Sequence, residues 1–477
     1  MRPLNNYADR VVRFFYSPVR TFALIASIFG LLTIVLMPPF TGADEEAHFV
    51  RAYGITEGSV TIGEDQLVEM PKSYLQTLGC MQNKQPSTGN TYTYNYEAYG
   101  KQKVTTLKCA LNLKLEEDNT EMVVTTASGY SPTTYIPQLL IIEIGKWLNL
   151  PVVTLAYGAR LSVLAAYVIM ISYAIKLLPR RKWALVGIAL MPTSILQVSN
   201  PGGDYMLLGA VAIFLSAIIL SIYEPKQYLM KNNRRLLSII TLSSLMMVLP
   251  KGIFPGICFL PLILFYGGIK YELHKKSGIL FSVLLAGLLW QKFGVTVIIG
   301  NSNNHTISPL DFPYALFKTS FYGMWSNKDF IFNSLNLGLN NPLGMPALAI
   351  SAMNMLFAMH VFVGYSVNKN NLHSTPNISE FTLKLLNLST WVVSSSVIIG
   401  SFFALFFAAS YLQDASGLIR GVQARYFYPA FILLAIMPLA RFFYAKKSTF
   451  RLVTICGSAL LLIIQTVALI IRYQWIH

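Results

Sequence analysis

Three residue types that can perform acid–base chemistry follow the first apolar segment of the chain at helical spacing. Asp44, His48 and Arg51 would lie on one face of a helix that begins at Asp44. Glu45 would lie on another face. A carboxylate, an imidazole and a guanidinium that converge in this way can take a proton from a hydroxyl group beside an anionic leaving group. The alternative is a simple helix start, capped by Thr41 and stabilised by early acidic residues.

We call the stretch from Asp44 to Arg51 the acidic motif. Two polar residues, one in this motif and one distant in sequence, have both a functional and a structural interpretation. His48 can orient the base or position a substrate, and a hydrogen-bonded structural histidine explains it equally well. Asp204 stands at the mouth of an apolar segment, after the sequence Asn-Pro-Gly-Gly. There it can position a substrate hydroxyl or hold Arg160, and a helix cap is the structural alternative.

Four basic residues are candidates for contact with an anionic group. Arg51 belongs to the motif itself. Arg160 lies about eight residues inside an apolar segment, where a structural ion pair is the alternative. Lys251 interrupts two apolar segments in the sequence Pro-Lys-Gly, where it can instead reach the lipid headgroups. Arg425 stands beside Tyr426, so an interfacial anchor is its alternative.

Composition identifies the class of protein that must hold these residues. The chain has 477 residues, of which 54% are hydrophobic and only 12% are charged, against about 25% charged in soluble domains. Such a chain has too little polar surface to cover a globule, so much of its apolar surface must face lipid. The composition therefore predicts an all-α polytopic membrane protein.

The net charge of +16 is distributed unevenly along the chain. Residues 41–150 contain thirteen of the 21 acidic residues against eight basic ones, whereas the rest of the chain is strongly basic. This asymmetry is typical of a membrane protein with one long outer loop and short basic inner loops, and it argues against nucleic-acid binding.

The apolar segments predict eleven membrane-spanning helices. The first, residues 21–40, has twenty residues without a charge and follows a basic N-terminal stretch, residues 1–20, so we expect a retained helix with a cytoplasmic N-terminus. Residues 135–148 are apolar but short and interrupted by charges, which favours a helix at the membrane interface; counting them as a span gives an alternative of twelve. The other ten segments are residues 152–178, 183–199, 204–223, 236–250, 254–269, 277–299, 344–366, 386–411, 424–444 and 450–472.

This topology divides the chain into a sequence of membrane and loop regions. After the first helix come a periplasmic loop that holds the acidic motif and the interfacial helix (41–150), a transmembrane bundle (151–299), a second outer loop (300–343) and the C-terminal helices (344–477). Cys80 and Cys109 both fall in the long outer loop, where they either form a disulfide or remain free thiols.

Several well-known site motifs are missing from the sequence. It has no Walker-type Gly-x-x-x-x-Gly-Lys, no Gly-x-Gly-x-x-Gly, no His-Glu-x-x-His and no Cys-x-x-Cys. ATP coupling, dinucleotide chemistry and zinc hydrolysis are therefore unsupported. A divalent cation held by Asp44, Glu45 and a sugar phosphate is an option, although no complete ligand set is evident and we assign no metal site.

The stretch from Pro38 to Gly58 resembles the opening signature of a bacterial membrane-protein family catalogued as domain of unknown function 2142. The resemblance rests on Asp44-Glu45, His48, Arg51-Ala52-Tyr53 and Glu57-Gly58. Three later stretches are similar to the same family: Tyr130-Ser131-Pro132 with Tyr135 and Pro137, Asn200-Pro201 with Asp204, and Gly421-Val422-Gln423-Ala424-Arg425-Tyr426-Phe427. The chain departs from the family pattern at Gly202-Gly203 and at Ala424.

This family in turn resembles the integral-membrane glycosyltransferases with the C-type fold (GT-C). The resemblance implies a sugar donor on polyprenyl phosphate, such as undecaprenyl phosphate, and an envelope glycan acceptor such as the O-antigen of lipopolysaccharide. It also implies a site on the periplasmic face of the bacterial inner membrane, with Asp44 as the base and Glu45 as its alternate. In that site Arg51, Arg160, Lys251 and Arg425 would face the donor phosphate, and His48 and Asp204 would position the substrates.

Two other classes of function remain open. A transporter or flippase of a lipid-linked or polar substrate usually places ionisable residues near the bilayer midplane, whereas most charges here lie at segment ends. A non-catalytic envelope assembly protein is the third class. The hexosyltransferase-like reading explains the acidic motif best, and the lipid bilayer, the lipid-linked sugar and the glycan acceptor are its expected partners.

Overall fold

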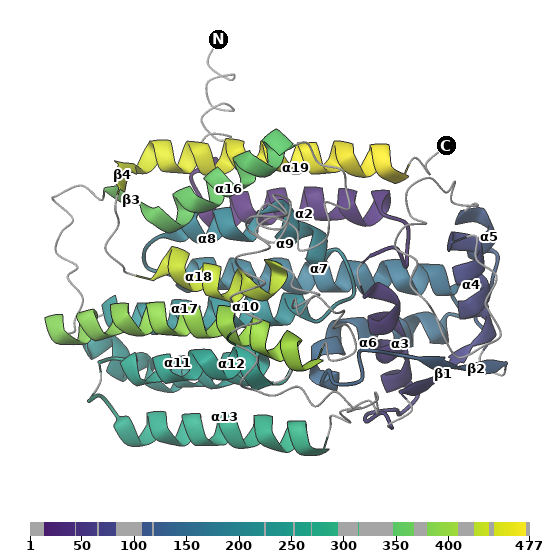
Figure 1. Cartoon of the computed structure of the whole chain (residues 1–477), viewed down its shortest axis with the longest axis horizontal. Helices are drawn as coiled ribbons and strands as arrows, with labels where there is room; N and C mark the ends of the chain where they lie inside the picture. Colours follow the sequence, from purple (N-terminus) through teal and green to yellow (C-terminus); the bar gives the residue numbers. More distant parts are fainter. Residues whose placement is uncertain are drawn as a thin grey trace, which may run out of the picture.

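In the described part of the chain, six long apolar helices run along the long axis of the computed structural model (Figure 1). The structure describes residues 14–42, 44–63, 66–82, 107–116, 119–223, 226–250, 253–268, 270–293, 313, 347–366, 379–408, 424–437 and 443–473. Each of the six is long and apolar enough to cross a membrane: α2 (Pro18–Leu36), α7 (Val152–Leu177), α10 (Asp204–Tyr223), α13 (Leu273–Phe293), α17 (Glu380–Ala408) and α19 (Lys447–Tyr473). The chain is therefore a mainly helical, polytopic membrane protein.

The ends of α2 follow from local sequence. Ser17 caps its first turn by accepting a hydrogen bond from the backbone N–H of Arg20, and Pro18 occupies the first helical position. The helix stops at Leu36 because Met37 precedes a proline and adopts an extended backbone. The chain thus leaves the helix immediately before the acidic motif.

Five of the eleven predicted segments contain shorter, broken or more polar helices. Pro192 starts a new helix after an extended Met191 and so divides its segment. The elements in these segments are α8 (Lys182–Ala189) with α9 (Pro192–Val198), α11 (Lys226–Val248), α12 (Ile253–Phe259) with η3 (Leu260–Phe265), α16 (Ala347–Phe362) and α18 (Tyr428–Ile436). The count of eleven spans, and the alternative of twelve, therefore remain predictions.

The described residues between 41 and 150 form a mixed unit at one end of the bundle, which we call the α/β unit (Figure 1). Its strands pair antiparallel, with Leu67 opposite Val124. Edge-to-face and stacked contacts among the rings of Phe40, Phe49 and Tyr74 give it an apolar core of its own. The unit contains α3 (Glu45–Thr56), β1 (Leu67–Pro71), α4 (Lys72–Gln82), α5 (Leu107–Leu111), β2 (Thr120–Val124), η2 (Pro132–Tyr135) and α6 (Ile136–Trp147).

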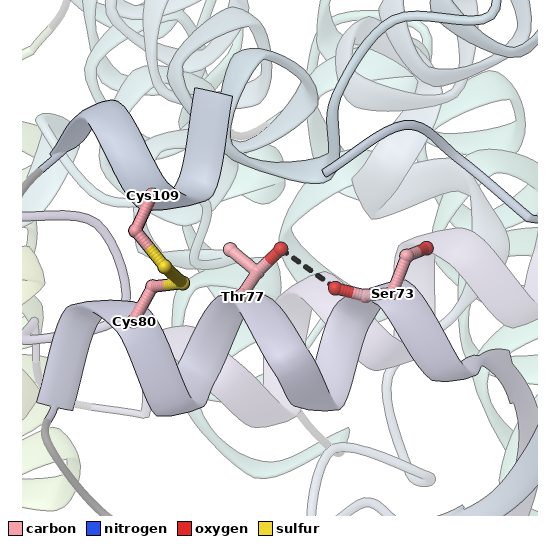
Figure 2. Close-up of a disulfide and its surroundings, with 4 residues drawn as sticks. All are labelled: Ser73, Thr77, Cys80 and Cys109. Carbon is pink, nitrogen blue, oxygen red and sulfur yellow. Dashed lines mark hydrogen bonds between the residues drawn. A yellow bond between two sulfur atoms is a disulfide. The ribbon is translucent and has the colours of Figure 1, made fainter. Parts of the chain in front are cut away.

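A disulfide between Cys80 and Cys109 joins α4 to α5 (Figure 2). Their Cα atoms are 5.8 Å apart. One turn before Cys80, the hydroxyl of Thr77 donates to the carbonyl of Ser73 at 2.7 Å, within the same helix. Of the two alternatives that the sequence left open, the structure therefore contains the bridge.

Helix α6 is the segment predicted to lie at the membrane interface. Its inner face, which includes Ile142 and Gly145, is buried, and its neighbours there are α3 and α7. The opposite face is a stripe of exposed apolar side chains, which we call the α6 stripe: Ile136, Leu140, Ile144 and Trp147. Spacing of three or four residues puts these side chains on one side of the helix. The stripe suits the apolar boundary of a bilayer, as the interfacial prediction requires.

The two ends of the bundle differ in charge. At the end opposite the α/β unit, α7 ends and α8, α11, α13 and α19 begin, and β3 (Val363–Ser366) pairs in parallel with β4 (Phe443–Lys446) (Figure 1). Basic residues gather at this basic end: Arg180, Arg181, Lys182, Lys231, Arg234, Arg235, Lys270, Lys275, Lys446, Lys447 and Arg451. The acidic motif lies at the other end of the same helices.

Candidate functional site

Three stretches that are far apart in the sequence meet where the α/β unit joins the bundle. His48 of α3 is hydrogen-bonded to Tyr135 of η2, with 2.7 Å between Nδ1 and the hydroxyl oxygen. Tyr205, in the first turn of α10, donates its hydroxyl proton to the carbonyl of Thr134 at 2.8 Å. The acidic motif, the loop around residue 130 and the Asn-Pro-Gly-Gly turn before α10 therefore form one site.

Asp44 occupies the position immediately before α3. Its backbone is left-handed, with φ +59° and ψ +9°, and its carbonyl accepts the backbone N–H of His48 at 3.1 Å. Asp44 is half-buried, whereas the next residue, Glu45, is fully buried. Because Asp44 precedes the first helical residue, it does not continue the helix face of His48 and Arg51 as the spacing predicted.

Thr41 does not cap α3. Its hydroxyl donates instead to the carbonyl of Pro38 at 2.6 Å. The carboxylate of Glu45, the first residue of α3, instead accepts the backbone N–H of Gly42 at 2.9 Å. This bond resembles the half of a capping box in which a helical side chain reaches back to the chain before the helix. The capping interpretation of Thr41 is therefore wrong, since the turn from Pro38 to Asp44 places its hydroxyl against the end of α2.

Glu45 and Arg160 form a buried ion pair between α3 and α7. The Arg160 Nε atom lies 2.6 Å from one carboxylate oxygen of Glu45, and Nη2 lies 2.7 Å from the other. Both side chains are fully buried. The sequence suggested Asp204 as the partner of Arg160, whereas the structure pairs it with Glu45.

All five N–H groups of the Arg160 guanidinium are occupied. Besides the two bonds to Glu45, it donates to the carbonyls of Ile34 at 3.2 Å, Met37 at 2.5 Å and Pro38 at 2.8 Å. These three carbonyls lie at or just beyond the C-terminal end of α2, where backbone carbonyls have no N–H partner within the helix. In this arrangement Arg160 has no donor left for a phosphate, and the structural ion pair is the better interpretation.

Arg51 is likewise fully buried and bound to the chain itself. It donates to the carbonyls of Ser59 and Val60, each at 2.6 Å, and to that of Tyr130 at 3.4 Å. Desolvation by burial lowers the pKa of the Arg51 guanidinium from its ordinary value. Arg51 therefore holds the turn after α3 against the Tyr130 loop and does not point into solvent.

His48 and Tyr135 are enclosed by aromatic and acidic neighbours. The ring of Tyr130 meets the imidazole edge-to-face, with centroids 4.7 Å apart. Burial raises the pKa of Tyr135 well above the ordinary value, and the nearby phenol of Tyr130 and carboxylate of Asp204 raise it further. Asp204, in the first turn of α10, is half-buried. The arrangement is a polar and aromatic cluster near the carboxylate of Asp204, and Asp44 joins it through its backbone contact with His48.

Two predicted phosphate contacts lie outside the part of the chain whose side chains the structure describes. Lys251 falls between the described ranges 226–250 and 253–268, and Arg425 belongs to η7 (Ala424–Phe427) by its backbone alone. Within the described ranges, no three His, Cys, Asp or Glu side chains gather closely enough to hold a metal ion. The predictions for Lys251 and Arg425 stay predictions.

Three polar residues at this junction were not among the predicted site residues. The side chain of Asn200 lies against Gly42, so closely that a β-carbon there would overlap its amide. The Gln138 amide donates to the carbonyl of Pro201 at 3.4 Å. The third residue is Tyr135, the partner of His48. The family resemblance was the one signal that marked Tyr135 and Asn200, and nothing in the local spacing marked Gln138.

The helices and the α/β unit at their end define a polytopic α-helical membrane protein with a polar site at one end of its bundle. The chain belongs to the family described as predicted membrane protein (DUF2142), whose family profile matches residues 27–435. The match includes the acidic motif, the Tyr130 loop and the Asn200 turn. No curated protein and no solved structure matches the chain.

Proposed function

We propose that the chain is a GT-C-type glycosyltransferase that moves a sugar from a polyprenyl-phosphate donor to an envelope glycan at the periplasmic face of the bacterial inner membrane. The observation that carries the proposal is the position of Asp44. Asp44 is half-buried, follows the end of α2 closely, and accepts the backbone N–H of His48 with its carbonyl; the His48 ring in turn contacts an aromatic cluster near Asp204. A lipid-linked substrate arriving in the bilayer would meet it at the membrane surface.

The chemistry requires one base and a stabilised leaving group. The Asp44 carboxylate takes the proton of the acceptor hydroxyl, whose oxygen bonds to the anomeric carbon of the donor sugar. The bond from that carbon to the phosphate oxygen breaks, and the lipid phosphate leaves with the electron pair. A positively charged side chain stabilises this leaving group better than a proton donor does.

The contacts favour Asp44 over Glu45 as the base. Both Glu45 oxygens accept hydrogen bonds from Arg160, and one also accepts the N–H of Gly42. Glu45 is thus committed to contacts within the chain, and we propose Asp44 as the base. Because every N–H group of Arg160 is bound within the chain, the remaining predicted contacts of the donor phosphate are Lys251, Arg425 and Arg51, whose buried Nε has no hydrogen-bond partner among the described residues.

Two independent features support the proposed orientation. Disulfides such as Cys80–Cys109 form in oxidising compartments, which supports a position of the α/β unit outside the cytoplasm. The basic end lies at the other end of the bundle, and basic loops favour the cytoplasmic side. The proposal therefore includes eleven spans, a cytoplasmic N-terminus and a periplasmic site.

Mass spectrometry of envelope glycans tests the function. A host strain expresses the wild type, Asp44→Asn, or the control Glu121→Gln, which removes an exposed carboxylate from β2 of the same unit, at matched membrane levels. We expect an increment of one sugar with the wild type and the control, and none with Asp44→Asn. An increment in no strain would overturn the transferase and favour transport, which flux into proteoliposomes without acceptor would measure. An increment in all strains would remove Asp44 as the base.

A further inference from the structure

We infer that Arg160 and Glu45 are positioning residues that hold Asp44 in its reactive place, and that Arg160 does not bind the donor phosphate. The inference rests on the proposed role of Asp44 as the base. It concerns the short turn from Met37 to Glu45, which connects the end of α2 to the start of α3.

The Arg160 guanidinium fixes the first half of this turn. Its Nη1 and Nη2 atoms donate to the carbonyls of Met37 and Pro38, where the chain leaves α2. Arg160 itself belongs to the buried face of α7, which packs against α2. The exit of the chain from α2 is therefore tied to a neighbouring bundle helix, and not only to residues next to it in sequence.

The Glu45 carboxylate fixes the second half. Its Oε2 atom accepts both the backbone N–H of Gly42 at 2.9 Å and Nη2 of Arg160 at 2.7 Å. The backbone N–H of Glu45 in turn donates to the Gly42 carbonyl at 3.3 Å. Glu45 therefore closes the turn on the residue two positions before Asp44 and anchors it to Arg160.

The backbone of Asp44 shows why such a clamp is needed. Aspartate adopts the left-handed region more readily than most residues with a β-carbon, yet a φ of +59° is still less favourable than a right-handed backbone. Glu45 and Arg160 constrain the C-terminal and N-terminal sides of the turn. Without them we expect Asp44 to relax to a right-handed or extended backbone, which changes the direction of its carboxylate.

Lysine cannot replace arginine in this clamp. The clamp uses the planar fork of Arg160 for the two Glu45 oxygens and its remaining donors for carbonyls on the other side. A lysine ammonium keeps the charge but has three donors at a single nitrogen. Arg160→Lys therefore keeps a positive charge beside Glu45 but loses hydrogen bonds to the turn. The variant distinguishes an effect of the position of the turn from an effect of charge.

Arg181 offers a matched control at the basic end. Like Arg160, it binds carbonyls of neighbouring helices, with Nε donating to Ala435 at 2.5 Å and Nη2 to His360 at 2.7 Å. It lies beyond the C-terminus of α7, about 25 Å along that helix from Arg160. Arg181→Lys should weaken the bundle without moving Asp44.

The first test needs no enzymatic activity. Asp44→Cys is introduced into a chain with Cys258→Ala and Cys456→Ala, and the rate of its labelling by a charged, membrane-impermeant maleimide is measured in right-side-out and inverted membrane vesicles. We expect Arg160→Lys to change the labelling rate severalfold and Arg181→Lys to leave it unchanged. An unchanged rate with Arg160→Lys, or an equal change with both, would overturn the clamp.

The second test uses transfer kinetics. We expect Arg160→Lys to lower kcat by about a hundredfold with little change in the donor KM. A raised donor KM with an unchanged kcat would identify Arg160 as a phosphate ligand and overturn the inference. If the wild type transfers no sugar, the proposed function fails, and the labelling experiment still decides the role of the clamp.

Discussion

The Nδ1 atom of His48 lies 2.7 Å from the hydroxyl of Tyr135, a residue 87 positions later in the chain. This hydrogen bond joins α3 to η2, and the Tyr130 ring closes over the imidazole. Because Tyr135 is fully buried, the pKa of its phenol is raised well above the ordinary value. The phenol therefore stays protonated near neutral pH as the hydrogen-bond partner of His48.

This neutral phenol makes stability depend on pH in the alkaline range. A tyrosine in the unfolded chain ionises with a pKa of about 10, whereas the pKa of folded Tyr135 is well above that value. The folded state then holds more protons than the unfolded state. The stabilising contribution of Tyr135 is thus complete below about pH 10 and declines by up to about 1.4 kcal/mol per pH unit above it.

We expect Tyr135→Phe to flatten this decline. The measurement is chemical unfolding in detergent from about pH 8 to about pH 11. Tyr444→Phe, at an exposed position of β4, is the control and should leave the slope unchanged. Equal slopes for the wild type and Tyr135→Phe would show that Tyr135 ionises normally and is not buried as described.

Two glycines in the site should differ in how much stability the protein loses when each is replaced by alanine. A β-carbon at Gly42 would approach the Asn200 amide nitrogen to 2.9 Å and its other amide atoms still more closely, whereas one at Gly202 would meet His48 ring atoms at 3.7 and 3.8 Å, which is ordinary contact. We expect Gly42→Ala to destabilise the protein by about 1–3 kcal/mol and to reduce transfer, and Gly202→Ala to be nearly neutral. Thermal unfolding and the glycan increment measure the two effects. Equal tolerance of both would mean that Asn200 does not lie against the turn.

Loss of the disulfide should destabilise the α/β unit. Cys80 and Cys109 are separated by 29 positions, and closing a loop of about that length stabilises a fold by roughly 3–4 kcal/mol in the chain-entropy model. We expect Cys80→Ser or Cys109→Ser, and dithiothreitol on the wild type, to lower the unfolding temperature by the same amount. The control Cys456→Ser, at an exposed free cysteine, should not. A wild type insensitive to the reductant would contradict the bridge.

The α6 stripe should face lipid. Leu140→Cys places a spin label on the stripe, and Glu121→Cys places one at an exposed polar position of β2 in the same unit. In liposomes, we expect the label at position 140 to be relaxed more by oxygen and less by a water-soluble nickel chelate than the label at 121. Both variants carry Cys258→Ala and Cys456→Ala to remove other labels. Equal accessibility to the chelate would place the stripe in water or against a protein partner.

Much of the local structure could be predicted from the sequence. Apolar length located the six long helices, and the interfacial segment 135–148 contains a helix with an exposed apolar stripe. The helix expected to start at Asp44 starts at Glu45. Such features depend on residues a few positions apart, which is the range over which hydropathy and helical periodicity carry information.

The pairings within the site could not be predicted. Glu45 and Arg160 are 115 positions apart, and the spacing of charges gave Arg160 three open choices: a phosphate, Asp204 or another acid. The turn after α2 determines the partner of Arg160. It brings the carbonyls of Met37 and Pro38 to the same guanidinium that binds Glu45. The left-handed backbone of Asp44 was equally hidden, since aspartate tolerates this conformation without requiring it, and the contacts around the turn decide whether it is adopted.

Helix α10 is the most apolar of the six long helices, yet nearly all of its side chains are buried within the protein. Its neighbours include α7, which precedes it, and α11 and α18, which are synthesised later. During synthesis α10 must therefore stand in lipid before the segments that enclose it exist. The high hydropathy of α10 allows it to insert into lipid at this early stage, whereas the shapes of its side chains determine how it packs in the finished bundle. Substitutions that keep the hydropathy of α10 but change the size or shape of its side chains should therefore insert normally and fail to assemble.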